Sequence, residues 1–519
     1  MHGVELVLIS LLVAVVVLSA ASRAIGVPYP IVLVLGGLVM GFIPGVPDVG
    51  LEPELVLVIF LPPLLYSAAF FASLRDIKYD LRTISLLAVG LVIATACAVA
   101  VVAHALIDGL PWAAAFALGA IVAPTDPLAA IEVGRRVGLP RRLATILEGE
   151  SLINDGSALV IYRVAVGAVG GAFSLTDAGA KFVLGAAGGI AIGLAVGWVI
   201  AEIRKRLDDP LVETTISILT GYAAYVPAER AGASGVLAAV TIGIYMGWRA
   251  PEISTARQRI SGYSMWTILT FLLNALLFVL IGLQLPLILD GLKDEPMGEL
   301  LGIAAAVAAV VIACRMIWVH VMTAAIRTLD RRQSQIARRG TWRGRIVTGW
   351  AGMRGAVSLA AALALPADFP ARDQLLFITF AVILATLVLQ GLTLPAVIRW
   401  SGVHDDGAES REELLARRRA TEAALTRLEE LEAEEWTRDD TVERMRGLYR
   451  YRSQRLSARE TDDEDGYEHR SRKYQKMVRL VLEAQRSAVV ELRNQGEISN
   501  EVMHRIEREL DLEDERLEI

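Results

Sequence analysis

Residues 112–127 read WAAAFALGAIVAPTDP, an apolar run that ends in an aspartate held between two prolines. Together with the adjoining residues, the run is long enough to form a helix that crosses a bilayer. Pro124 and Pro127 each lack a backbone donor, so the helix is expected to be interrupted around Asp126. A proline kink with an Asp that reaches water is the alternative. We favour a functional carboxylate because Asp126 lies near the middle of its span, where charge is costly and usually lines a pathway.

The composition around this run places most of the chain in a membrane. Of the 519 residues, 54% are hydrophobic, and the mean hydropathy is +0.49. This is too apolar for a soluble protein. Residues 401–519 differ, with 22 Lys and Arg against 31 Asp and Glu. We therefore expect two parts, a transmembrane domain over residues 1–400 and a charged tail over residues 401–519.

Apolar runs predict an all-α membrane protein with thirteen spans. Their centres lie near residues 12, 37, 63, 95, 122, 155, 190, 219, 241, 275, 312, 355 and 386. Lys and Arg gather in alternate connections, including seven between Arg327 and Arg345. Because basic loops stay cytoplasmic, this pattern predicts an outside N-terminus and a cytoplasmic C-terminus.

The sixth predicted span concentrates polar groups at bilayer depth. It reads Glu148-Gly-Glu-Ser-Leu-Ile-Asn-Asp-Gly156. Helical spacing places Glu148, Ser151 and Asp155 near one face, with Glu150 and Asn154 on an adjacent stripe. Carboxylates that only stabilise packing are the alternative, but Ser or Thr would do this at lower cost. We therefore expect a functional site here.

Buried arginines accompany these acids. Arg315 lies in the eleventh span, and Arg354 lies in the twelfth within GWAGMRG (349–355), whose glycines allow a second helix break. Set against Asp126, Glu150 and Asp155, two arginines leave one carboxylate without a fixed cation, where a transported ion can bind. Arg163 either gates the outer path or extends to the outer interface, and we favour the interface.

The two predicted breaks suggest internal symmetry. Spans five and twelve are seven spans apart, so their orientations in the membrane are opposite. This predicts six-helix inverted repeats, spans one to six and eight to thirteen, with span seven as connector. Two broken helices would then cross at the midplane, where Asp126 and Arg354 can neutralise opposed half-helix ends.

Six motifs in this order resemble the monovalent cation:proton antiporter family, which includes NhaP-type Na⁺/H⁺ antiporters and animal Na⁺/H⁺ exchangers. They are residues 60–66 (FLPPLLY), 125–127 (TDP), 150–155 (ESLIND), Arg315, 352–356 (GMRGA) and 390–395 (QGLTLP). The resemblance covers about residues 5–400. It implies a homodimer in which spans four to six and eleven to thirteen move against a dimerisation scaffold.

The resemblance also implies roles for single residues. Asp155 and Asp126 would bind Na⁺ and, in turn, H⁺, aided by Ser151 and Thr125. Asn154, with Asp155, is similar to the Asn-Asp pair of the electroneutral branch.

The charged residues around these ligands would have structural roles. The resemblance implies that Glu150 pairs with Arg315 and that Arg354 braces the broken helix. In the double-proline stretch of span three some members carry a ligand acid that has no counterpart here.

The expected function is electroneutral exchange of Na⁺ for H⁺ by alternating access across the plasma membrane, serving pH and Na⁺ homeostasis. Removing a carboxylate from water favours its protonated form, so H⁺ and a cation compete for one site. Hard oxygen ligands suit an alkali cation. K⁺/H⁺ exchange is an alternative, as is a cation channel. An intramembrane aspartyl protease lacks its Gly-x-Gly-Asp signature here. We therefore expect no enzyme, resident cofactor or nucleic-acid partner.

The tail is predicted to be helical over residues 412–435 and 470–493. It carries no phosphate loop or metal cluster. A solvated appendage and a pH- or partner-sensing regulatory domain remain equal alternatives.

Overall fold

The computed structural model describes residues 2–44, 58–171, 175–293, 295–329, 340–405, 407–458 and 467–518. Two compact units divide the chain, Met1–Asp405 and Asp406–Ile519. Every secondary-structure element within the described residues is a helix. Most of the predicted basic loop between Arg327 and Arg345 lies outside the described residues.

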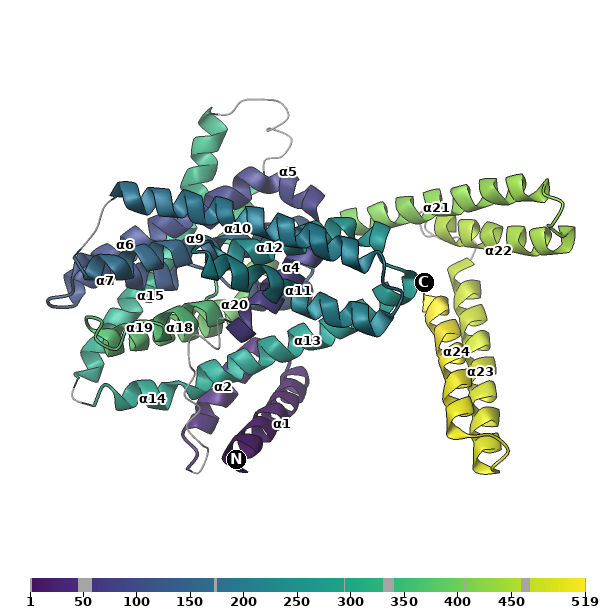
Figure 1. The fold of residues 1–519 in the computed structure, drawn as a ribbon, viewed down its shortest axis with the longest axis horizontal. Helices are drawn as coiled ribbons and strands as arrows, with labels where there is room; N and C mark the ends of the chain where they lie inside the picture. Colours follow the sequence, from purple (N-terminus) through teal and green to yellow (C-terminus); the bar gives the residue numbers. More distant parts are fainter. Residues whose placement is uncertain are drawn as a thin grey trace. The chain divides into compact units, whose positions relative to one another are not determined.

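The described part of the first unit contains twenty helical elements (Figure 1). They are α1 (His2–Ile25), α2 (Tyr29–Gly41), α4 (Leu61–Phe71), α5 (Leu74–Ser85), η1 (Leu86–Leu91), α6 (Val92–Leu106), α7 (Trp112–Val122), α8 (Pro127–Arg135), α9 (Arg141–Val169), α10 (Leu175–Arg204), α11 (Pro210–Arg230), α12 (Gly235–Ile253), α13 (Ala256–Leu283), α14 (Leu285–Asp290), α15 (Met297–Leu329), α17 (Trp342–Trp350), α18 (Ala356–Leu363), α19 (Arg372–Ala385), η2 (Thr386–Gln390) and α20 (Gly391–Ser401).

Length and composition identify 7 helical segments among the described residues that can cross a membrane. They are Leu74–Leu106, Trp112–Arg135, Arg141–Val169, Phe182–Arg204, Ala256–Asp290, Met297–Thr328 and Arg372–Ser401, with shorter apolar helices at Ile9–Ile25, Tyr29–Gly41 and Leu61–Phe71. All predicted span centres fall within helices except the one near residue 355, which falls in the break between α17 and α18. The chain is thus an all-helical, multi-span protein, and the count of thirteen spans stays a prediction.

Both predicted helix breaks are present. α7 ends at Val122 and α8 begins at Pro127, with Asp126 as its N-cap residue. α17 ends at Trp350 and α18 begins at Ala356. Proline and glycine produce these breaks for local reasons, because proline lacks a backbone donor and glycine leaves the backbone free to turn.

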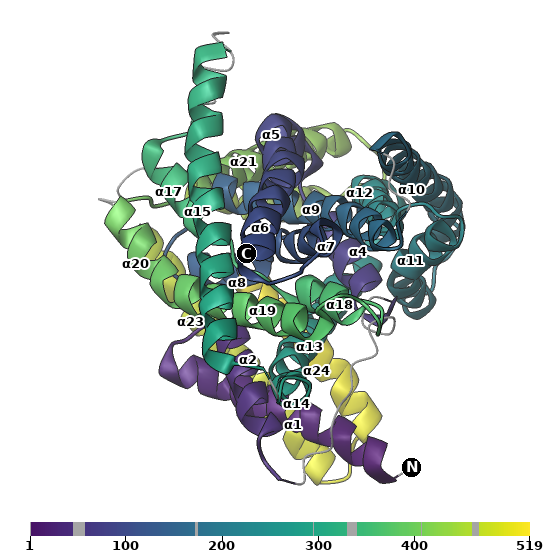
Figure 2. The same ribbon diagram turned by 90° about the vertical axis from the view of Figure 1, so that its left-hand side faces the viewer.

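Apart from α14, which contacts helices of both sets, the helices of the first unit pack in two groups. α2 packs against α13, and α4 and α10 pack against α12; α6 and α9 pack against α7, and α15 packs against α6 and α19. We call the first group, α1, α2, α4 and α10–α13, the outer group, and the second, α5–α9, α15 and α17–α20, the crossing group. Figure 2 shows α10, α11 and α12 on one side of the unit and α15, α17 and α20 on the other.

The described part of the second unit contains four helices. They are α21 (Ala408–Glu432), α22 (Asp439–Ala458), α23 (Tyr467–Asn494) and α24 (Asn500–Glu518). α21 pairs with α22 and α23 with α24, as two antiparallel hairpins (Figure 1). Leu482 and Val489 of α23 are buried, as are Met503 and Leu510 of α24. The helices predicted at 412–435 and 470–493 correspond to α21 and α23.

Candidate ion-binding site

The two helix breaks meet in the crossing group. The backbone N–H of Asp126 donates to the carbonyl of Met353 at 2.8 Å, so the two interrupted segments are directly bonded. Gly355 lies so close to Asp126 that a Cβ there would overlap the carboxylate. Glycine at this position therefore allows the second break to approach the first.

Opposite charges lie at the half-helix ends, as the sequence predicted. Asp126 Oδ1 accepts the Leu128 N–H at 2.9 Å at the start of α8, where the helix dipole is positive. Arg354 is 1% exposed, and its Nε donates to the carbonyl of Val122, the last residue of α7, at 3.0 Å. It also donates to the Gly352 carbonyl. Each side chain stabilises backbone groups that the breaks leave unpaired.

A hydroxyl that sequence reasoning missed also holds the second break. Thr386 is fully buried in the π-helical turn η2, and its Oγ1 accepts the Arg354 backbone N–H at 3.2 Å. π-turns often lie at functional sites, but nothing in the sequence around Thr386 distinguishes it from a packing residue.

Glu150 and Arg315 form a buried ion pair between α9 and α15. Both Glu150 carboxylate oxygens accept from Arg315, Oε2 at 2.8 Å and Oε1 at a shorter distance. The Arg315 Nε donates to the Thr348 carbonyl in α17 at 3.0 Å. With 0% and 2% of their side chains exposed, the two residues neutralise each other away from water.

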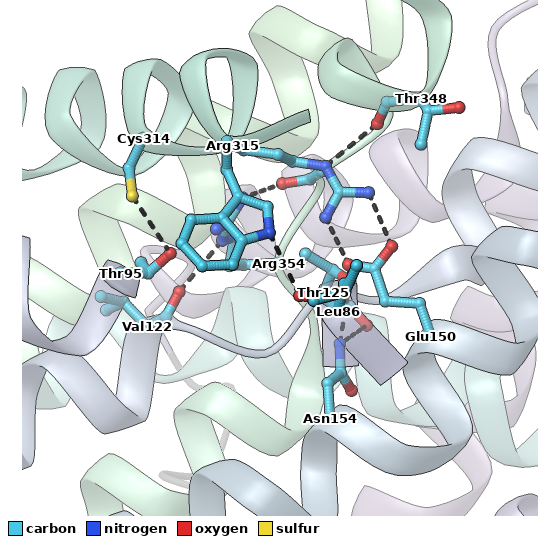
Figure 3. A network of polar contacts seen from close by, with 12 residues as sticks. Leu86, Thr95, Val122, Thr125, Glu150, Asn154, Cys314, Arg315, Thr348 and Arg354 are labelled. Atoms are coloured by element: carbon cyan, nitrogen blue, oxygen red, sulfur yellow. Dashed lines mark hydrogen bonds and ion pairs between the residues drawn. The ribbon is translucent and has the colours of Figure 1, made fainter. Parts of the chain in front are cut away.

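Thr125 connects this pair to the first break (Figure 3). Its hydroxyl donates to Glu150 Oε1 at 3.0 Å and accepts from Asn154 Nδ2 at 3.0 Å. Asn154 is 1% exposed, and its Oδ1 has no hydrogen-bond partner among the described residues. The Thr125 hydroxyl is therefore occupied, whereas the Asn154 oxygen is available to a ligand.

Asp155 lies one helical turn beyond Ser151 on α9 and is 7% exposed. Asp126 is close enough to act on it electrostatically. Within the described part of the chain, Asp155 has neither a hydrogen bond nor a cationic partner. Asp155 and Asp126, with the partly exposed Ser151 and the Asn154 oxygen, make a set of hard oxygen donors that suits an alkali cation.

The balance of charges differs from the sequence-based expectation. The sequence predicted one carboxylate without a fixed cation, but the described residues leave two, Asp126 and Asp155. The reason is that Arg354 binds backbone carbonyls and not a carboxylate.

Two further ion pairs were not predicted. Arg204, which belongs to the basic run Arg204-Lys205-Arg206, is 4% exposed and pairs with the equally buried Glu213. Arg163 of α9 is half exposed, and it pairs with Glu229 of α11 at 2.6 Å. The partner of a charge depends on tertiary packing, so neither pair had a signal in the sequence.

Comparison with known proteins shows which family the chain resembles. Residues 8–400 match the family model described as sodium/hydrogen exchanger, transmembrane. An uncharacterised Na⁺/H⁺ exchanger of Mycobacterium tuberculosis is 39% identical over 98% of this chain and 96% of its own length. The Na⁺/H⁺ antiporter ApNhaP of Aphanothece halophytica is 36% identical over 82% of this chain and 80% of its own. A sodium, potassium, lithium and rubidium/H⁺ antiporter of Bacillus pumilus is 35% identical over 71% of this chain and 57% of its own.

The fold also resembles a solved structure. The sodium proton antiporter MjNhaP1 of Methanocaldococcus jannaschii superposes with a TM-score of 0.58 at 21% identity, over 76% of this chain and 98% of that one. The chain therefore belongs to the sodium/hydrogen exchanger family of multi-pass membrane proteins, which are ion transporters and not enzymes.

Proposed function

We propose that this protein exchanges Na⁺ for H⁺ in a one-to-one ratio, and that both ions bind in turn at Asp155. The observation that supports this most is the buried Asp155 carboxylate, which is close enough to Asp126 to interact with it electrostatically and has no cationic partner among the described residues. Na⁺ would be held by Asp155 and Asp126 with Ser151, the Thr125 backbone carbonyl and the Asn154 oxygen.

Charge balance supports an electroneutral cycle. Glu150 is neutralised by Arg315, and Asp126 is stabilised by the N-terminal end of α8, so both can stay ionised throughout. Asp155 is then the one acid of the site that must exchange a proton for a cation. One positive charge replaces another at each turnover, so no net charge crosses.

Alternating access would be achieved by movement of the crossing group against the outer group, in an elevator-like manner. The division of the first unit into these two helix groups supports this proposal. Two chains would assemble as a homodimer in the plasma membrane, with the N-terminus outside and the tail in the cytoplasm. The exchange would serve Na⁺ and pH homeostasis.

K⁺/H⁺ exchange is the first alternative. It is favoured by the Bacillus pumilus relative, which is named as an antiporter of potassium and rubidium as well as sodium and lithium. A cation channel is the second, because carboxylates at mid-membrane depth also suit a pore. The site itself does not select among alkali cations by donor type, since all of them prefer oxygen.

The test uses proteoliposomes that contain a pH-sensitive dye, with the membrane potential clamped at different values. Addition of Na⁺ should move protons outward at a rate that does not depend on the potential. Replacement of Na⁺ by K⁺ in the same assay decides between the two exchange reactions. Cation flux that follows the potential without proton counterflow would instead show a channel.

A further inference from the structure

The tail unit has an exposed surface that carries basic and apolar side chains together. On α22, Arg444, Leu448 and Tyr451 follow one another at spacings of four and three, so they share a helix face. On α23, Tyr474, Met477 and Val481 do the same at spacings of three and four. The rings of Tyr451 and Tyr474 contact each other, with centroids 6.0 Å apart, so the two faces are continuous.

We call this surface the tail patch. It consists of Arg444, Leu448, Tyr451 and Arg452 from α22, and Lys473, Tyr474, Met477, Leu480 and Val481 from α23. Five of its apolar members are about half exposed to solvent. The exposed fractions are 47% for Leu448, 49% for Tyr474, 57% for Met477, 56% for Leu480 and 54% for Val481. A contiguous group of this kind marks an interaction site and not an ordinary solvated face.

The charge of the patch is opposite to that of the tail as a whole. Residues 444–458 and 473–482 contain no Asp or Glu, although the tail carries 31 acids against 22 bases. Two acids of α24 lie against the other side of α23, where Asp514 pairs with Arg479 and Arg486, and Asp511 pairs with Arg486. Arg446 is excluded from the patch because Glu432 and Glu443 bind it. Positive charge is therefore concentrated on the exposed face.

We propose that the tail patch docks on the surface of the bilayer by binding anionic phospholipid headgroups. An amphipathic helical surface with basic residues beside apolar ones matches such a membrane surface, with the apolar side chains entering the headgroup boundary. Covalent attachment favours this occupant, because α20 ends at Ser401 and the tail unit begins at Asp406, so the chain itself connects the patch to a membrane domain and raises its effective concentration at a bilayer. This inference does not depend on the transport reaction.

The test uses the full-length chain in nanodiscs of phosphatidylcholine, with or without phosphatidylglycerol. Cys97 and Cys314 are replaced by Ala, and an environment-sensitive dye is attached through Met477→Cys. We expect a blue shift and quenching by spin-labelled lipid only when phosphatidylglycerol is present, both reversed by high salt. A dye at Glu501→Cys on α24 should show neither change.

Charge variants make the test specific. Arg444→Gln, Arg452→Gln and Lys473→Gln together should weaken docking on the order of a hundred-fold, since each basic residue near an anionic surface contributes about a factor of five. The matched control removes three exposed arginines outside the patch, Arg419, Arg427 and Arg508, and should leave docking unchanged.

Two results would overturn the proposal. A blue shift without quenching by spin-labelled lipid would mean that protein covers the patch, and dependence of that shift on protein concentration would identify a second copy. The absence of any shift in phosphatidylglycerol nanodiscs would mean that the patch stays in water.

Discussion

The backbone N–H of Asp126 donates to the carbonyl of Met353 at 2.8 Å, and this bond joins the two interrupted helices of the proposed ion-binding site. α8 starts and α7 ends at this point. Asp126 accepts a hydrogen bond at the start of α8, and Arg354 donates one to the end of α7. Any movement that separates the two breaks must break this bond. The carboxylates of the proposed site therefore depend on the backbone around residues 351–355.

Gly355→Ala should abolish exchange. The added Cβ would overlap the Asp126 carboxylate, so the two breaks must separate, at a cost of about 1–3 kcal/mol for overpacking. Gly298→Ala is the matched control, because a Cβ there meets no atom within 4 Å. Cation-driven proton flux in proteoliposomes measures both variants. Normal flux through Gly355→Ala would show that close approach at this position is unnecessary.

Removal of either member of the Glu150–Arg315 pair should destabilise the protein more than removal of both. Glu150→Gln or Arg315→Met leaves one buried charge without its partner, which costs about 3–5 kcal/mol. The double variant should recover most of that loss in a thermal unfolding measurement in detergent. Glu413→Gln, which breaks an exposed tail pair with Arg417, should cost less than about 1 kcal/mol. A double variant no more stable than the single ones would contradict this account of the pair.

An ion pair between Arg163 and Glu229 connects α9 of the crossing group to α11 of the outer group. Its Nη2–Oε2 distance is 2.6 Å. The other Glu229 oxygen accepts the Gly235 N–H at 3.0 Å, so Glu229 is fixed to its own group. A thiol crosslinker between Arg163→Cys and Glu229→Cys, with the native cysteines replaced, should stop exchange reversibly if the groups move.

The control crosslink lies within one group. Asp76 of α5 and Arg141 of α9 both belong to the crossing group, and Arg141 Nη2 lies 3.0 Å from Asp76 Oδ2. Because these helices would move together, a crosslink between cysteines at the two positions should leave exchange intact. Full activity with the Arg163–Glu229 positions crosslinked would exclude movement of α9 against α11.

The Na⁺ concentration for half-maximal exchange should rise as pH falls. A proton on the shared carboxylate must leave before Na⁺ binds, so the apparent KM rises about tenfold per pH unit once the protonated form predominates. At higher pH the site is ionised and the apparent KM becomes constant. Initial rates over a grid of pH and Na⁺ concentration measure this. A constant KM with a falling maximal rate would indicate that protons act elsewhere.

The helix breaks could be inferred from the residues themselves, whereas the Glu150–Arg315 pair was expected only from the family resemblance and the other charge partners had no signal in the sequence. Pro124 and Pro127 act on the backbone locally, so the break at Asp126 can be inferred from the sequence. Arg354 binds the Val122 carbonyl because α7 ends beside it, which depends on packing between segments more than two hundred residues apart. Arg204 stands in a basic run typical of a loop, yet it is buried with Glu213.

Proton release on cation binding tests the central claim most directly. Na⁺ is added to the solubilised protein in weak buffer, and released protons are followed with a pH indicator. We expect one proton per chain for the unaltered protein and for Asp290→Asn, whose side chain is 70% exposed. Asp155→Asn, eluting as a folded protein, should release none. Undiminished proton release from Asp155→Asn would contradict the claim that Na⁺ and H⁺ share this carboxylate.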